Sequence, residues 1–405
     1  MRRVVITGMS ALTSIGNHWG EVRDNLLAGN SGVAIMDEWK FIQGLNCYLA
    51  APVTFKHSHY PRKKVRGMSR VSLMATRVTE QSLADSGISG DHCDYTRLGI
   101  AYGSSIGATE QFVPFGRVLS DNLARGISPT GYIQMMSHTA AVNLSIFFGI
   151  KGRMIPTSAA CASGGQALGY AYEMIKQGIT PWMIAGSAEA LCPTQVAVFD
   201  SFYSASLNHK APHKSVKPFD SLRDGLVVGE GAASFILEDL DHALARKAPI
   251  IAEVAGFATN MDGSHITRPD SDIMALVMKQ ALSAASLAPE NIGYINAHAA
   301  GTAGDRAEAQ AIRKVFSNRV PVTSSKGHIG HTLGGCGALE AWLTINMINE
   351  GWVAPTLNLE SVADDCGGIQ HIMHNHKMLD IDYAMTNNFA FGGVNTSLIF
   401  KRWSH

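Results

Sequence analysis

The sequence lacks a net charge and any long apolar run. Lysine plus arginine and aspartate plus glutamate both number 33 in 405 residues, so no overall field favours nucleic acid or an anionic membrane. No stretch approaches the roughly 18 to 20 consecutive apolar residues of a membrane-spanning helix. Residues 1–8 contain too few apolar side chains for a secretory signal. We expect a soluble protein with neither a nucleic-acid nor a membrane partner.

Cysteine is also sparse. The chain has 6 cysteines without a CxxC pair, far from the density of a secreted disulfide scaffold. This usage is typical of a reducing compartment, and we expect the protein to be cytoplasmic. Most of these cysteines are expected to be small buried apolar residues.

The chain contains two similar patterns. A β-branched run at residues 3–6 ends near Gly8, and another at residues 250–254 ends near Gly256. The first half closes with an apolar run at 233–238 and the second with one at 396–401. Within each half, strand-like runs alternate with helix-like stretches, which favours α/β layering. We therefore predict two related halves, 1–245 and 246–405, fused in one body.

The most informative segment is residues 154–165, which reads as a strand or loop that delivers Cys161 to the start of a helix. The helix should run to about Gln177, where Gly178 is a suitable stop. A thiol at a helix N-terminus gains thiolate character from the dipole and the free N–H groups. Small neighbours leave room for a bulky thioester. The segment alone equally allows a packing cysteine.

An ordered set of motifs extends this observation over essentially the whole chain. It comprises residues 3–8, Ala-Cys-Ala-Ser-Gly at 160–164, Lys-Pro-Phe-Asp at 217–220, Arg-Asp-Gly at 223–225, Gly-Glu-Gly at 229–231, Asn-Ala-His at 296–298, Asp-Arg-Ala-Glu at 305–308, Ser-Ser-Lys at 324–326, Gly-His at 330–331 and Asn-Asn-Phe-Ala-Phe-Gly-Gly at 387–393. With these motifs the sequence resembles the β-ketoacyl-[acyl carrier protein] synthases, the ketosynthases that elongate acyl chains with a Cys-His-His site on a thiolase-like fold.

The resemblance implies a five-layered α-β-α-β-α body. Its N-terminal half, 1–245, would carry the nucleophile, and its C-terminal half, 246–405, would carry the catalytic histidines and lysine. The resemblance also implies a homodimer, or a heterodimer with a related ketosynthase-like subunit, with Cys161 near the interface.

The resemblance further implies a role for each site residue. Cys161 would accept an acyl group, while His298 and His331 would stabilise the enolate formed when a malonyl thioester loses carbon dioxide. Lys326 would orient and support the histidines. The backbone N–H groups of Cys161 and Phe391 would form an oxyanion hole, and Phe391 would gate the site. His328 is expected to be structural.

Two departures from the family pattern bear on the substrate. Ala300 stands where a hydroxyl commonly contacts phosphopantetheine, and Thr302 can still supply a second contact. Ala390 replaces the usual glycine between two aromatics, which narrows backbone freedom at the gate. The chain would need no cofactor of its own, since the acyl carrier protein brings phosphopantetheine. Either fatty-acid elongation or a specialised polyene or polyketide-like pathway fits.

Two further sets of residues match family positions. A buried polar or monovalent-cation site under the histidines would involve Asn296, Glu308, Glu340, Asn387 and Asn388. A basic cluster would dock the acidic acyl carrier protein through Arg62, Lys63, Lys64, Arg66 and Arg70, because paired charges steer and orient association.

Other interpretations remain open. Residues 103–107 satisfy the GxSxG pattern, so an α/β-hydrolase with Ser105 as nucleophile is the main rival. A non-catalytic chain-length partner subunit and a thiolase are further alternatives. His371, His374 and His376 do not predict a metal site, because a strand would put His371 on the opposite face from the other two. The glycine-rich residues 330–337 lack the ending of a phosphate loop.

Overall fold

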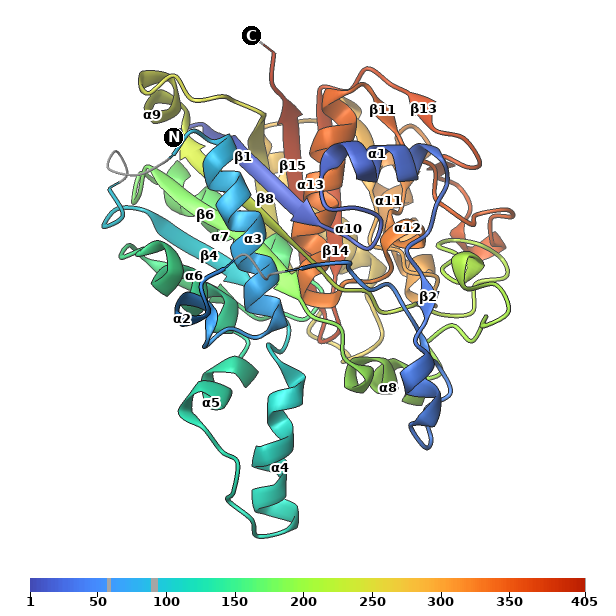
Figure 1. Cartoon of the computed structure of the whole chain (residues 1–405). Coiled ribbons are helices and arrows are strands. Elements are labelled where there is room, and N and C mark those ends of the chain that lie inside the picture. The colour runs from blue at the N-terminus through green and yellow to red at the C-terminus, as the bar shows by residue number, and fades with distance from the viewer. Residues whose placement is uncertain (57–59, 89–93, 405) are drawn as a thin grey trace.

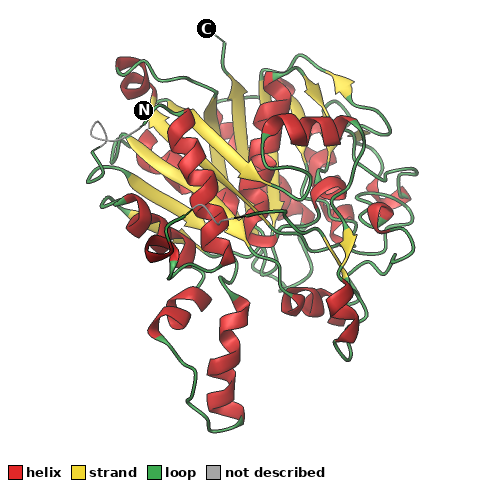
Figure 2. Ribbon diagram, viewed as in Figure 1, coloured by secondary structure: helices red, strands yellow, loops and turns green. Residues whose placement is uncertain are grey.

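The computed structural model describes residues 1–56, 60–88 and 94–404, so His57, His59 and Cys93 lie outside the described residues. Its centre is a mixed sheet in the order β12-β10-β9-β14-β15-β8-β1-β7-β6-β4-β5 (Figure 1, Figure 2). The strands are β1 (Val4–Leu12), β4 (Gly99–Gly103), β5 (Met154–Thr157), β6 (Trp182–Glu189), β7 (Gly231–Asp239), β8 (Ala252–Met261), β9 (Ile292–Asn296), β10 (Pro321–Thr323), β12 (Gln370–His371), β14 (Tyr383–Phe389) and β15 (Val394–Arg402).

The strand pairing repeats itself on either side of the β1–β8 junction. In the first half β1 pairs with β7 and β7 with β6, both antiparallel, and then β6, β4 and β5 follow in parallel. In the second half β8, β15 and β14 pair antiparallel, and β14, β9 and β10 follow in parallel. The antiparallel pair β1–β8 joins the two series. The predicted pseudo-repeat is therefore confirmed.

Helices form three layers around these strands. The outer helices α3 (Arg70–Asp85) and α6 (Thr139–Phe148) cover the first half, and α10 (Ser271–Ala285) and α11 (Gly304–Phe316) cover the second. Between the halves lie α7 (Ser163–Lys176) and α13 (Cys336–Asn349), which contact each other. Helix α7 also contacts β4 and β6 on one side and β8 and β15 on the other. This is the expected five-layered arrangement.

The two central helices meet at their N-terminal ends because glycine allows their backbones to touch. A Cβ atom on Gly164 would lie 2.6 Å from the backbone nitrogen of Ala338. One on Gly337 would lie 2.3 Å from that of Gly165. Nearly every residue of α13 is buried, and most of them are apolar or small, as expected for a helix inside a core. The segment that leads into α7 is thereby held against the second half.

Shorter elements complete the body. They are α1 (Trp19–Leu27), α2 (Arg62–Val65), α8 (Pro193–Ser201), α9 (Leu240–Ala245), α12 (Lys326–Ile329), and the two-stranded sheets of β2 (Ala34–Ile35) with β3 (Leu49–Ala50) and β11 (Trp352–Val353) with β13 (Lys377–Met378). Helices α4 (Phe112–Ser120) and α5 (Pro129–Met135) project away from the rest of the molecule (Figure 1). Among the described residues, no helix combines the length and apolar character needed to cross a bilayer.

Candidate active site

Cys161 lies in the short turn between β5 and α7. The preceding residue, Ala160, adopts a left-handed conformation with φ of 46°. The Ser163 hydroxyl holds this turn, since it accepts from the Ala159 N–H at 2.9 Å and donates to the Ala160 carbonyl at 2.7 Å. Helix α7 then ends at Lys176, next to the predicted stop at Gly178. The turn leaves Cys161 only 6% exposed, on the wall of a cavity of about 240 Å³.

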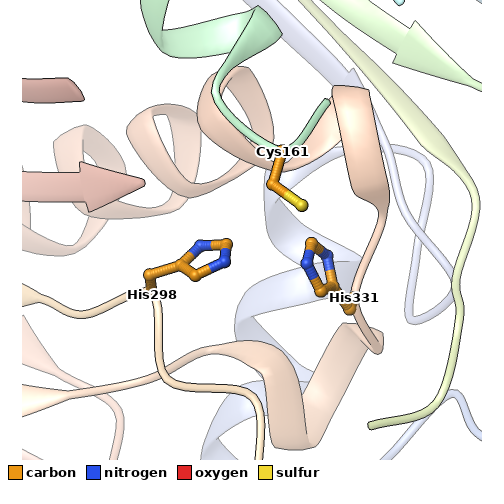
Figure 3. A group of neighbouring side chains, drawn as sticks. All are labelled: Cys161, His298 and His331. Atoms are coloured by element: carbon orange, nitrogen blue, oxygen red, sulfur yellow. The ribbon is translucent and has the colours of Figure 1, made fainter. Parts of the chain in front are cut away.

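Two imidazoles face this sulfur from the other half of the chain (Figure 3). His298 follows β9, and His331 follows α12. Their ring centroids are 5.1 Å apart and the rings are nearly perpendicular. The Cys161 sulfur and one nitrogen of each histidine all lie within 4.8 Å of one another. All three residues line the same cavity, so the structure brings the predicted Cys-His-His set together.

The hydrogen bonds of the two imidazoles determine their tautomers. The Leu333 N–H donates to Nδ1 of His331 at 3.1 Å. The Lys326 ammonium, which can only donate, lies 3.2 Å from Nδ1 of His298. Burial and, to a smaller extent, the charge of Lys326 lower the pKa of both histidines well below the usual value. Both rings are therefore neutral and carry their proton on Nε2, as N–H donors.

Lys326 is paired with Glu340 in the fully buried interior behind His298. Burial opposes the charge of Lys326, but the attraction of Glu340 outweighs it and raises the lysine pKa. The Asn388 amide donates to the second carboxylate oxygen of Glu340 at 2.6 Å. The ion pair therefore holds a fixed positive charge beside His298, as predicted for Lys326.

The expected thiolate at Cys161 is not what the surroundings favour. Burial raises the pKa of the Cys161 thiol to about 11, although Lys326 and the backbone N–H groups of Phe391 and Cys161 act in the opposite direction. The N–H groups at the helix start therefore act in the predicted direction, but burial has the larger effect and the thiol is protonated at neutral pH. The helix N-terminus does not compensate for the loss of water around the sulfur. The two N–H groups both act on the sulfur of Cys161.

Phe391 stands at the mouth of the cavity, in the turn between β14 and β15. Its ring lies 5.4 Å from that of Phe199 and 6.3 Å from that of Phe202, and it is 39% exposed. Sequence reasoning missed the two partners because α8, which carries or adjoins them, contains none of the family motifs quoted above. The turn itself uses left-handed Gly392 and Gly393, with φ of 89° and 75°.

Comparison with known proteins identifies the family of the chain. A family model described as the N-terminal domain of β-ketoacyl synthase matches residues 1–243, and the C-terminal domain model matches residues 251–360. The 3-oxoacyl-[acyl-carrier-protein] synthase 2 of Vibrio cholerae is 36% identical, with 99% of each chain covered. The chain belongs to the β-ketoacyl synthase family.

Solved structures of ketosynthases show the same fold. A β-ketoacyl synthase from Burkholderia phymatum matches with a TM-score of 0.97 and 48% identity over 100% of both chains. A type II polyketide ketosynthase, solved in complex with its acyl-carrier protein, matches with a TM-score of 0.88 and 27% identity, again over 100% of both chains. The resemblance, the thiolase-like fold and the class of condensing acyltransferase are thus confirmed.

The two departures in this synthase have different structural settings. Ala300 is buried, and its N–H, together with those of Gly301 and Thr302, donates to the carboxylate of Asp305. Thr302 lines the cavity, where its hydroxyl also accepts from the Gly304 N–H at 3.2 Å. Ala390 stays outside the left-handed region, and its N–H donates to the Val394 carbonyl. Its methyl group therefore strains no backbone in this conformation.

The predicted polar cluster under the histidines contains unpaired oxygen atoms. Oδ1 of Asn296, Asn387 and Asn388 has no hydrogen-bond partner among the described residues, and all three side chains are buried. Asn388 also bonds the Glu340 carboxylate, and a set of buried neutral amide oxygens suits a hard monovalent cation. Glu308 instead accepts from the His298 N–H at 2.8 Å, and burial raises its pKa to about 8.

The basic residues of the predicted docking cluster differ in their contacts. Arg62, Lys63, Lys64 and Arg66 are exposed on or beside α2. The Arg70 guanidinium differs, because it binds both carboxylate oxygens of the buried Glu230, at 2.8 and 2.6 Å.

Ser105 follows β4, but a loop and the 3-10 turn η3 (Thr109–Gln111) come next instead of the helix of a hydrolase elbow. The Ser105 N–H donates to a buried glutamate, Glu189.

His371 hydrogen-bonds the Cys366 carbonyl. The potential metal-ligand groups found in the described part of the chain surround His298 and include neither His371 nor its neighbours His374 and His376. His328 is buried against the Asn30 carbonyl.

Proposed function

We propose that the chain is a β-ketoacyl-[acyl carrier protein] synthase, which condenses an acyl group on Cys161 with malonyl-acyl carrier protein. One observation carries the proposal: a cavity-facing thiol lies within 4.8 Å of two neutral imidazoles, both of which present Nε2–H. A non-catalytic chain-length subunit would not need this arrangement.

The first step is acyl transfer. The sulfur of Cys161 bonds to the carbonyl carbon of the acyl-carrier thioester while the carbon–sulfur bond to the carrier breaks. The proton of the Cys161 thiol passes to the departing carrier thiolate, which leaves as a thiol. The N–H groups of Cys161 and Phe391, which already act on the sulfur, stabilise the oxygen of the tetrahedral intermediate.

The second step uses the histidines. The bond between the malonyl Cα and its carboxylate breaks, carbon dioxide leaves, and the electron pair moves onto the thioester oxygen as an enolate. The Nε2–H groups of His298 and His331 donate to that oxygen, and Lys326 adds positive charge behind them. The enolate carbon then attacks the acyl group, and Cys161 leaves as a thiolate that takes one proton.

The carrier protein would dock beside α2. Arg62, Lys63, Lys64 and Arg66 offer an exposed positive surface to an acidic helix. Arg70 is partly exposed beside them, and its charge is paired with Glu230. The related ketosynthase solved with its acyl-carrier protein supports this class of partner. Thr302 lies along the cavity and suits contact with the phosphopantetheine arm that the carrier protein would bring.

A second ketosynthase-like subunit would complete the assembly. Strand β5, which leads to Cys161, forms one edge of the sheet, and its Met154 is 39% exposed. Helix α4 contains no buried residue and exposes Leu119 and Val113. Exposed apolar surface on a projecting element supports a subunit contact, in either a homodimer or a heterodimer.

The proposal extends to a bound cation, to the cellular compartment and to the pathway. Asn296, Asn387 and Asn388 would hold a monovalent cation, which would supply a fixed positive charge below the Lys326–Glu340 pair. The five described cysteines are free, which suits a cytoplasmic enzyme. The pathway would be fatty-acid synthesis or a specialised polyene or polyketide-like elongation.

Mass spectrometry with a panel of acyl-carrier proteins tests the proposal. We expect an acyl adduct on Cys161 and, after addition of malonyl-carrier protein, a β-ketoacyl product with release of carbon dioxide. Charge reversal of Lys63 and Lys64 should raise KM for the carrier protein about tenfold while kcat stays near the wild-type value. An adduct on Ser105, or no product with any malonyl thioester, would contradict the proposal.

A further inference from the structure

Glu189, the last residue of β6, is a fully buried carboxylate that is not among the residues lining the cavity. One of its oxygens accepts from the backbone N–H groups of Ser105, at 2.7 Å, and Gly334, at 3.1 Å. The other is approached by Gln195 Nε2 at 3.4 Å and the Ser104 hydroxyl at 3.5 Å. The mechanism above does not use this group, although four polar atoms converge on it.

One of these partners belongs to the turn that orients His331. Gly334 directly follows Leu333, whose N–H donates to His331 Nδ1 and whose backbone is left-handed, with φ of 48°. Leu333 and Gly334 both lie in the 3-10 turn η6 (Leu333–Gly335). Since a left-handed leucine is strained, other contacts must hold the turn. The Glu189–Gly334 bond is one such contact.

The approach of this turn to Glu189 is as close as the backbone permits. A Cβ atom on Gly334 would lie 2.4 Å from the Ser105 nitrogen and 2.6 Å from the Glu189 carboxylate. Any side chain at position 334 would therefore push the turn away from the carboxylate. The glycine is needed for contact here.

Another partner reaches the nucleophile segment. The Ser105 carbonyl accepts from the Ser158 hydroxyl at 3.3 Å, and Ser158 lies three residues before Cys161. The Gly-Ser-Ser-Ile-Gly turn at 103–107, which resembles a hydrolase motif, thus presents its backbone to Glu189 and to the segment that carries the thiol. The carboxylate joins the first half of the site to the His331 turn.

We propose that Glu189 is a positioning residue for decarboxylation, which keeps the Leu333 N–H on His331 Nδ1 and so keeps the Nε2–H of His331 directed into the cavity. This inference rests on the proposed function. Loss of the carboxylate leaves the Gly334 N–H buried without its acceptor and frees the turn to move. His331 then loses the contact that selects its tautomer, whereas acyl transfer to Cys161, which does not use His331 as an enolate donor, continues.

The test separates the two half-reactions in the full-length enzyme. Burial raises the pKa of Glu189 to about 7, so rates are measured at about pH 8, where the carboxylate is ionised. For Glu189→Gln we expect kcat for condensation with malonyl-carrier protein to fall on the order of 10- to 100-fold, as for the loss of a group that orients a catalytic histidine. The KM for that substrate and the rate of Cys161 acylation should change less than about threefold.

Two other variants serve as a second perturbation and a control. Gly334→Ala displaces the same turn and should reproduce the selective loss of condensation. Glu238→Gln alters another fully buried glutamate, on β7, which binds Arg246 away from the cavity. It should lower thermal stability but leave the ratio of condensation to acylation unchanged.

The outcomes are distinct. Equal losses of acylation and condensation in Glu189→Gln, or a Gly334→Ala enzyme with wild-type condensation, would overturn the positioning role. The proposed function would fail separately, if the wild-type enzyme accepted an acyl group but formed no β-ketoacyl product.

Discussion

The two central helices begin in similar places, but the cysteine thiols near their N-terminal ends have different surroundings. Cys161, just before α7, lines the cavity, while Cys336, the first residue of α13, lies outside it and donates to the Cys161 carbonyl at 3.1 Å. Burial raises the pKa of both thiols, to about 11 for Cys161 and well above the ordinary value for Cys336. The fold repeats its scaffold, and access to the cavity distinguishes the nucleophile from the packing thiol.

The most direct way to break this comparison is to remove each thiol in turn. Cys161→Ala should lower product formation by roughly 10³-fold or more, because Cys161 is the one thiol among the described residues that line the cavity. Cys336→Ala should keep activity within about threefold and cost about 1 kcal/mol of unfolding free energy through lost packing. Acyl-adduct mass spectrometry and urea unfolding measure both effects. A Cys336→Ala enzyme that cannot be acylated would contradict the distinction.

The loops before the two helices also differ in charge. Residues 158–162 contain no charged side chain, whereas the segment before α13 includes α12, whose first residue, Lys326, is paired with Glu340. Lys326→Met should lower the free energy of unfolding by about 3–5 kcal/mol, because it leaves a buried carboxylate without its counter-ion.

The double variant Lys326→Met with Glu340→Gln should be more stable than Lys326→Met alone. Urea unfolding of the two single variants and the double variant measures this coupling. Additive losses would show that the pair contributes no mutual stabilisation.

The pH dependence of alkylation sharpens the comparison. With its pKa raised to about 11, Cys161 should react with iodoacetamide about ten times faster for each pH unit between about 7 and 10, since only the thiolate attacks. Cys336 should remain unlabelled while the protein is folded, because it is 1% exposed. Peptide mapping after timed labelling distinguishes the two sites. A labelling rate of Cys161 that is already constant at neutral pH would contradict the raised pKa.

The smallest effect is expected at the other candidate nucleophile of the first half. Ser105→Ala should change acylation and condensation less than about twofold, because the backbone N–H and carbonyl of Ser105, which bond Glu189 and Ser158, both survive the substitution. Steady-state kinetics measure this, and Ser163→Ala, which removes the hydroxyl that closes the Cys161 turn, provides a contrasting variant. A large loss in Ser105→Ala would reopen a catalytic role for the serine.

Much of the site could be predicted from local patterns. The segment around Cys161 predicts a strand or loop followed by a helix, and the ordered motifs identified His298, His331 and Lys326 as site residues. The cavity partners of Phe391 could not be predicted in this way, because Phe199 and Phe202 come from a distant helix region and carry no motif. The pairing of Arg70 with the buried Glu230 could not be predicted from the sequence either, because the two residues are far apart along the chain.

The sequence by itself determined the two related halves. Strand and helix periodicity and the small residues at close contacts depend only on residues that are near one another along the chain. Only the tertiary structure decided the protonation of the site. The pKa values of Cys161, His298 and His331 depend on burial and on the charge of Lys326, and both arise when loops from opposite halves exclude water from one cavity.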